Sequence, residues 1–149
     1  MFLKMVNEQC QDDFLKLAME LCWADGNFGD AEREMMRLYG EEVGKTDEEL
    51  AIYYEGVEKD RGKSSPCKSR MRSLVENIKD NSEEQERKII LFELLGLAYA
   101  DADFAKKEQE FMQSTKEVLG IEDVFVKEAS LLLEQYMELQ EKITKHVLG

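Results

Sequence analysis

The sequence has little proline and little cysteine, and each shortage excludes a class of protein. Only one proline occurs in 149 residues, and long alternating runs of β-branched residues are missing, which argues against a sheet protein. The three cysteines, Cys10, Cys22 and Cys67, form no C-x-x-C pair and are odd in number. A disulfide framework and a cysteine-based zinc site are therefore not expected, and free thiols in a reducing cytosol predict a cytoplasmic protein.

Long apolar runs and basic charge are also scarce. The longest apolar run, residues 89–100, is interrupted by Glu93 and is shorter than the ~18 residues of a membrane-spanning helix. No signal segment opens the chain, so direct membrane insertion is not expected. The 33 acidic and 20 basic residues give a formal net charge of −13, which disfavours nucleic acid and anionic lipid surfaces as partners. A divalent cation or a basic protein partner suits this charge better, although the acidity could serve solubility alone.

Catalytic patterns are missing as well. The single histidine, His146, falls in the last expected helical turn, so no Ser/His/Asp or Cys/His relay can be built. No glycine-rich phosphate loop is present either. The sequence therefore predicts a protein that is not an enzyme.

Helical periodicity dominates the chain instead. Apolar residues recur at helical spacing, as at Phe14, Leu17, Ala18 and Leu21, and 43% of all residues are apolar. Helices are expected over residues 6–24, 30–39, 46–58, 66–79, 83–100, 105–119 and 121–147. These segments predict an all-α fold, a compact bundle of about seven helices, in one domain that spans residues 1–149.

Local signals refine these helices. Capping boxes are predicted at residues 46–49 and 82–85, and glycines 40 and 44 are expected to break the second helix. The second helix is expected to direct three residues inward: Met35, Leu38 and Tyr39. The last helix carries a set of apolar residues that suits a packed helix: Val124, Leu131, Leu132, Tyr136, Leu139 and Ile143.

The chain contains an internal repeat, over about residues 10–44 and 86–120. Leu-Cys-Trp-Ala-Asp-Gly-Asn-Phe, residues 21–28, returns as Leu-Ala-Tyr-Ala-Asp-Ala-Asp-Phe, residues 97–104. Asp25 thereby aligns with Asp101, and Glu32 aligns with Glu108. Each copy follows an apolar helix and opens a second one, and neither copy alone is long enough to bury its apolar face. We therefore expect the two helix-turn-helix units to share one core.

The acidic turns allow two interpretations. Turn chemistry alone explains them, because a carboxylate in the first turn of a helix stabilises the helix dipole. If the two turns pack side by side, however, four carboxylates converge: Asp25, Glu32, Asp101 and Glu108. Such a cluster normally holds a cation, and its oxygen ligands point to Ca²⁺, Mg²⁺ or Mn²⁺. An EF-hand is excluded, because its obligatory glycine is replaced by Asp30 or Lys106 and its final glutamate by a methionine.

The doubled pattern A-D-G-x-F-x(3)-E in a small acidic helical chain resembles the TerB-like tellurite-resistance proteins. The resemblance spans about residues 10–140 and implies a bundle of about seven helices built from two pseudo-symmetric repeats. It also implies a metal site at Asp25, Glu32, Asp101 and Glu108, and a binding role in tellurite, metal-ion or stress response. Ala102 departs from the pattern, and Lys106 and Lys107 could neutralise Glu108 without a metal.

The sequence thus favours a non-catalytic module that binds a divalent cation, a protein partner, or both through the paired turns. A structural interaction module without metal and a carboxylate-metal hydrolase are the alternatives. Only a basic cluster supports the hydrolase, and a solvated linker is the simpler interpretation of that cluster: Lys59, Arg61, Lys63, Lys68, Arg70 and Arg72. Glu93 is expected to reach solvent or to pair with a lysine, the alternative being a buried extension of the acidic site. The partner and the oligomeric state are not determined by the sequence.

Overall fold

The fold was analysed in a computed structural model, which describes residues 1–23, 29–61, 67–100 and 106–149. A short 3-10 helix, η1 (Leu3–Met5), precedes the α-helices. The α-helices are α1 (Glu8–Trp23), α2 (Asp30–Glu42), α3 (Asp47–Arg61), α4 (Cys67–Asn81), α5 (Glu84–Ala100), α6 (Lys106–Leu119) and α7 (Asp123–Leu148). Since these residues include no strand, the predicted all-α fold of about seven helices is confirmed.

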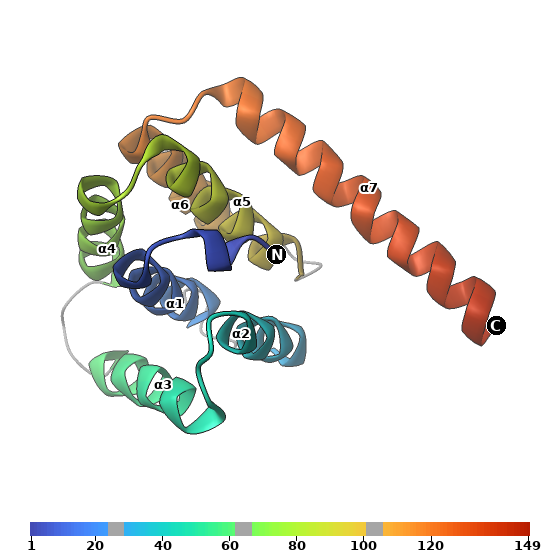
Figure 1. The fold of residues 1–149 in the computed structure, drawn as a ribbon, viewed down its shortest axis with the longest axis horizontal. Coiled ribbons are helices and arrows are strands. Elements are labelled where there is room, and N and C mark those ends of the chain that lie inside the picture. The colour runs from blue at the N-terminus through green and yellow to red at the C-terminus, as the bar shows by residue number, and fades with distance from the viewer. Residues whose placement is uncertain (24–28, 62–66, 101–105) are drawn as a thin grey trace.

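Helix α1 lies at the centre of the molecule (Figure 1). It packs against α2, α3, α4 and α5, while α6 contacts α4 and α5. Its apolar residues Phe14, Leu17 and Ala18 are fully buried, as their spacing predicts. Helix α5 is buried on most sides too, because Ile90, Leu91 and Leu94 are also inaccessible. The cluster of buried side chains draws residues from all seven helices, so both halves of the sequence contribute to one core.

The first predicted capping box is confirmed at α3. The Thr46 hydroxyl oxygen accepts the Glu49 backbone N–H at 3.2 Å, and the Glu49 carboxylate accepts the Thr46 backbone N–H at 3.3 Å. These two bonds satisfy backbone donors that have no partner within the helix. The sequence therefore predicts the start of this helix correctly.

The second predicted capping box, at residues 82–85, is wrong by one residue. The Ser82 hydroxyl donates to the carbonyl of Ile78 at the end of α4, so it does not cap α5. Instead the Glu86 carboxylate accepts the Glu83 backbone N–H at 3.0 Å, and α5 begins at Glu84. The Ser82 hydroxyl thus bonds to a carbonyl four residues earlier, at the end of α4, and so does not cap α5.

Helix α2 differs from the prediction in two ways. Gly40 does not break it, because α2 continues to Glu42 and ends before Gly44, whose φ is 79°. A Cβ added at Gly40 would lie 2.6 Å from a methyl carbon of Leu50, so the missing side chain permits close packing of α2 on α3. The inward face is also rotated, because Met36 is fully buried whereas Leu38 is 45% exposed.

Helix α7 departs most from the expected packing. Only Ala129 and Leu133 of this helix are buried, and the apolar residues expected to pack are exposed, from Val124 to Ile143. Figure 1 shows the reason, since α7 contacts α5 near its start and then extends away from the other helices. None of the described helices combines the length and the apolar character needed to cross a membrane.

Candidate functional site

The start of α2 places Glu32 in the predicted acidic site. Glu32 is the third residue of α2 and is only 5% exposed. Its carboxylate accepts the backbone N–H of Gly29, the residue before the helix, at 3.4 Å. Asp30 lies in the same first turn. Both negative charges therefore lie at the positive end of the α2 dipole, where they are stabilised.

The other three predicted ligands are less completely placed. Asp25 and Asp101 lie outside the described residues, so the predicted convergence of the two turns is untested. Glu108 is the third residue of α6, the position that Glu32 has in α2, but its side chain is also outside the described set. Over the described ranges, no three His, Cys, Asp or Glu side chains are grouped so that they could hold a metal ion. The metal assignment therefore stays a prediction.

A partly buried ion pair lies one helical turn before the first acidic turn. Glu20 on α1 is 5% exposed, and its carboxylate accepts a hydrogen bond from Arg70 Nε on α4 at 2.9 Å. Arg70 belongs to the basic cluster, and Arg72 of that cluster pairs with Glu76 on the surface of the same helix. Arg70 thus binds a carboxylate of this chain. Sequence reasoning missed the pair because contact between α1 and α4 sets it, not spacing along one helix.

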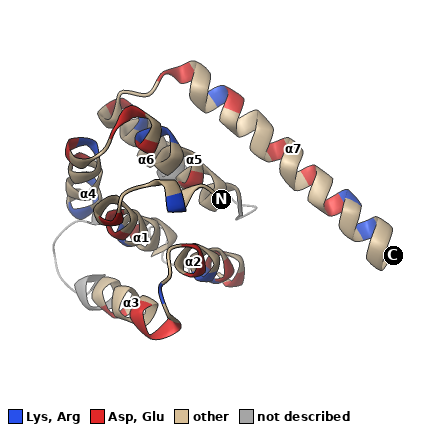
Figure 2. Ribbon diagram, in the orientation of Figure 1, with Lys and Arg blue, Asp and Glu red and all other residues tan. Residues whose placement is uncertain are grey.

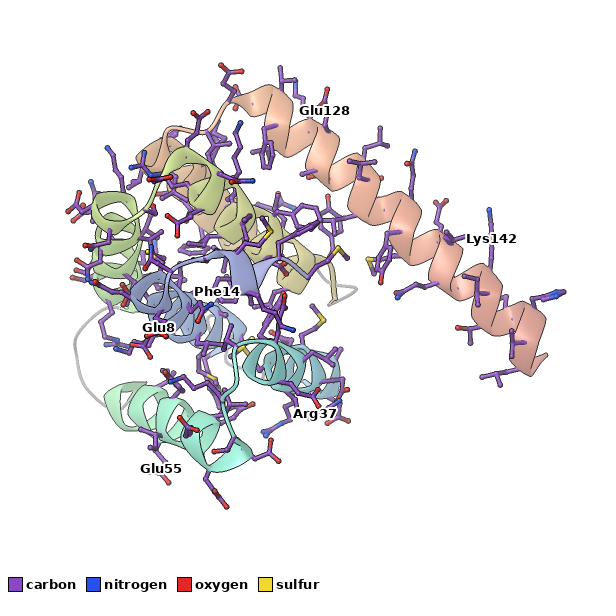
Figure 3. The ribbon with its side chains drawn as sticks, in the orientation of Figure 1. Glu8, Phe14, Arg37, Glu55, Glu128 and Lys142 are labelled. Carbon is purple, nitrogen blue, oxygen red and sulfur yellow. The ribbon has the colours of Figure 1, made fainter. Side chains whose placement is uncertain are left out.

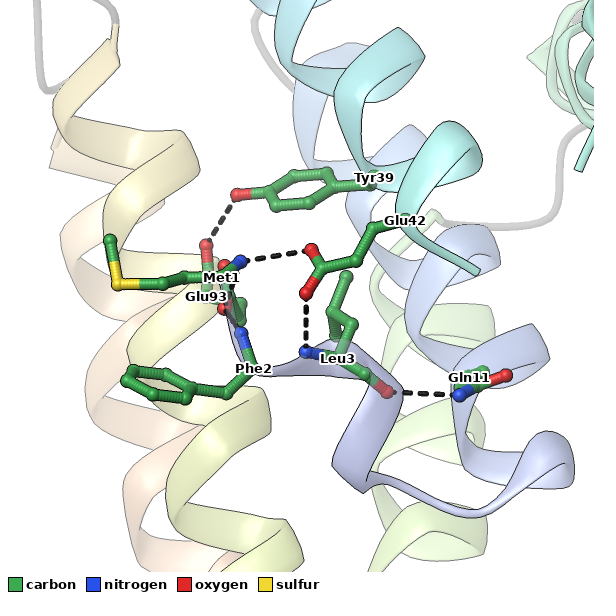
Figure 4. A network of polar contacts seen from close by, with 7 residues as sticks. All are labelled: Met1, Phe2, Leu3, Gln11, Tyr39, Glu42 and Glu93. Atoms are coloured by element: carbon green, nitrogen blue, oxygen red, sulfur yellow. Dashed lines mark hydrogen bonds and ion pairs between the residues drawn. The ribbon is translucent and has the colours of Figure 1, made fainter. Parts of the chain in front are cut away.

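A second polar network surrounds Glu93 (Figure 4). Glu93 is 4% exposed, and its Oε1 accepts the Phe2 backbone N–H at 2.8 Å and lies 2.7 Å from the Met1 amino group. The expectation that Glu93 reaches solvent or pairs with a lysine is therefore wrong. Glu93 does not reach solvent because α5 is enclosed by other helices on this side. The cation that contacts Glu93 is the Met1 amino group and not a lysine.

Helix α2 completes this network. The Glu42 carboxylate accepts the Leu3 backbone N–H at 3.1 Å and contacts the Met1 amino group at 2.9 Å. The Tyr39 hydroxyl donates to the backbone carbonyl of Glu93 at 2.8 Å. Partial burial alone would lower the pKa of the Met1 amino group, but hydrogen bonds and charges from Glu93 and Glu42 outweigh it and raise this pKa above 8.0. The network ties the N-terminal segment, α2 and α5 together.

The remaining described acidic residues and the two described cysteines do not form a further candidate site. Acidic residues are distributed over all seven α-helices, as Figure 2 shows. Cys10 and Cys22 are buried free thiols. Burial raises the pKa of the Cys10 thiol, which disfavours the reactive thiolate. Among the described residues, the Glu93 network and the Glu20–Arg70 pair are the charged contacts that link different helices at buried carboxylates.

Comparison with known proteins agrees with the resemblance read from the acidic turns. No curated protein and no solved structure matched the chain. The family model described as "Tellurite resistance protein TerB" matches residues 11–131, which include most of α1, all of α2 to α6, both acidic turns and the first part of α7. With a match over most of its length, an all-α fold and the doubled motif, the chain belongs to the TerB tellurite-resistance family.

Proposed function

We propose that this chain is a non-catalytic TerB module that binds a divalent cation, a protein partner, or both through its paired acidic turns. The observation that carries the proposal is the burial of Glu32 at the first turn of α2, within the region that matches the family. Buried carboxylates cluster at binding and catalytic sites more often than elsewhere, and this one belongs to the motif that the family shares. We expect the module to act in the cytoplasm, in a tellurite, metal-ion or stress response.

The donor set suits a hard cation. The four candidate ligands, Asp25, Glu32, Asp101 and Glu108, offer only carboxylate oxygens, which Ca²⁺, Mg²⁺ and Mn²⁺ prefer over nitrogen or sulfur. The positive end of the α2 dipole competes with a cation for the charge of Glu32, so the aspartates would have to contribute most of the attraction. Removing both aspartates is therefore the sharpest perturbation.

Isothermal titration calorimetry with Ca²⁺, Mg²⁺ and Mn²⁺ tests the cation half of the proposal. We expect saturable binding to the native chain and its loss in the double variant Asp25→Asn, Asp101→Asn. The matched control is the double variant Glu34→Gln, Glu110→Gln. It also removes two negative charges, but from exposed positions, and should leave binding intact. Absence of binding to the native chain, or equal weakening in both variants, would overturn the cation site.

The interaction module without metal is the remaining candidate if no cation binds. It is favoured by the contact of Glu32 with Gly29, since that bond gives the carboxylate a structural role without any ligand. The hydrolase alternative loses support, because Arg70 of the basic cluster is paired with Glu20 and does not serve as a free anion contact. A binding module is therefore a better proposal than a hydrolase.

A further inference from the structure

Helix α7 leaves the bundle after one point of attachment. Ala129 and Leu133 are buried where α7 meets α5, whereas every residue from 134 to 149 is exposed. At 1.5 Å per residue, the free segment is about 20 Å long. Figure 3 shows the contrast between Phe14, enclosed by helices, and Lys142, which extends from α7 into solvent.

The free part of α7 is apolar along one side. We define the α7 stripe as five residues with exposed fractions from 46% to 69%: Leu132, Tyr136, Leu139, Ile143 and Val147. They follow Ala129 at alternating steps of three and four residues, with a last step of four. This spacing is the a/d pattern that buries one helix against another in a coiled coil. The α7 stripe continues from Ala129, which is buried on α5. The pattern therefore favours packing of the stripe against another helix.

The charge of this segment favours a second copy of the chain as the occupant. Residues 132–149 contain three glutamates and two lysines, a formal charge of −1 out of the −13 of the whole chain. Two acidic molecules therefore repel one another only weakly through this segment. The acidic residues Glu134 and Glu138 also come before the basic residues Lys142 and Lys145. Antiparallel pairing brings the basic end of each helix toward the acidic part of the other.

The position of the bundle also favours antiparallel pairing. Helix α5 covers the start of the stripe side at Ala129 and Leu133, so a parallel partner helix would collide with the bundle. An antiparallel partner keeps the two bundles at opposite ends. The family match ends at residue 131, so the α7 stripe lies entirely beyond the matched region. The structure thus separates this surface from the acidic turns.

We propose that the chain forms a homodimer in which the α7 stripes of two copies pack antiparallel about a two-fold axis between Tyr136 and Leu139. This contact is self-complementary, as a two-fold interface requires. It places Leu132 of each copy next to Ile143 of the second copy. Sedimentation equilibrium should then give twice the monomer mass of 17.3 kDa.

Two substitutions on the same helix test the interface. Leu139→Glu introduces a charge in the stripe and should yield a monomer at concentrations where the native chain is dimeric. Leu131→Glu is the matched control, because Leu131 is 55% exposed and Leu139 is 56% exposed, yet Leu131 lies outside the α7 stripe, about 80° around the helix from Leu139. Neither residue is buried, so circular dichroism should show unchanged helix content. A native chain that stays monomeric at millimolar concentration, or equal loss of dimer in both variants, would overturn the proposal.

Cysteine cross-linking tests the orientation, in a Cys67→Ser background. An equimolar mixture of Leu132→Cys and Ile143→Cys chains should form a mixed disulfide, whereas each chain alone should not. Self-cross-linking of the Ile143→Cys chain would show a parallel dimer and contradict the proposed geometry. Binding of a monomeric native chain to neutral phosphatidylcholine vesicles would assign the stripe to a lipid surface and would also overturn it.

Discussion

Replacing Glu93 with glutamine should destabilise the protein and change how its stability depends on pH. The substitution keeps the size of the side chain and an oxygen that can accept the Phe2 N–H, but it removes the negative charge beside the Met1 amino group. Breaking a buried ion pair costs about 3–5 kcal/mol, and an exposed pair contributes at most about 1 kcal/mol. Glu93 is 4% exposed and the Met1 side chain is 51% exposed, so the loss should be about 2 kcal/mol after this discount for solvent screening.

The pH dependence has a defined sign. The folded-state pKa of the Met1 amino group is raised above its ordinary value of 8.0 by Glu93 and Glu42, against the lowering effect of burial. The interaction therefore contributes stability that is fully present below about pH 8 and is lost as the pH rises through the folded-state pKa. In the Glu93→Gln variant this loss should be smaller. The Cys10 thiol also loses its proton in alkaline solution, but it is common to both proteins and cancels in the difference.

Urea unfolding at about pH 7 and about pH 9.5 measures both effects. At the lower pH the free energy of unfolding should fall by about 2 kcal/mol, equivalent to about 4–8 °C in Tm for a chain of this size. The difference in the free energy of unfolding between the native protein and the variant should be smaller at the higher pH. Glu34→Gln is the control, because Glu34 is exposed and pairs with Arg37, which does not titrate in this range. A gap that is constant with pH, or a variant as stable as the native chain, would refute the assigned role of Glu93.

Two further predictions concern packing. Tyr39→Phe keeps the ring, whose centroid lies 5.1 Å from that of Phe14, but loses the hydroxyl that donates to the Glu93 carbonyl, and should cost about 1 kcal/mol in urea unfolding. A loss above about 3 kcal/mol would mean that the ring packing itself had changed. Gly56→Ala on exposed α3 should stabilise the protein by up to about 1 kcal/mol, because nothing lies within 4 Å of the added methyl group. Gly40→Ala should show no such gain by the same measurement, since its methyl group would press on Leu50.

Local signals in the sequence predicted local structure well. The capping box of Thr46 and Glu49 forms as expected, and α2 begins at Asp30 as expected, because these features depend on bonds within a few residues. The stripe from Phe14 to Leu21 also predicts the buried side of α1. The family resemblance was correct for the same reason, since it rests on one short motif that occurs twice.

Features that depend on contacts between helices were predicted poorly. Leu38 was expected inside and Met36 was not considered, because the buried side of α2 is set by where α1, α3 and α5 lie. The partners of Glu20 and Glu93 come from residues 50 and 91 positions away, a distance that no helical period reports. For the acidic turns, the sequence correctly predicted that Glu32 lies in the first turn of a helix. The expected proximity of Asp25 and Asp101 stays a prediction.

The contacts of the N-terminal segment bear on the order in which the protein folds. Phe2 and Leu3 are held by carboxylates from α5 and α2, across sequence separations of 91 and 39 residues. The Phe2 bond requires α5 to be in place and the Leu3 bond requires α2, so we expect both to form after these helices have packed on α1. Contacts made after the rate-limiting step leave the folding rate nearly unchanged and slow the unfolding rate. The first residues of the chain therefore act chiefly on how long the folded state persists, and little on how fast it is reached.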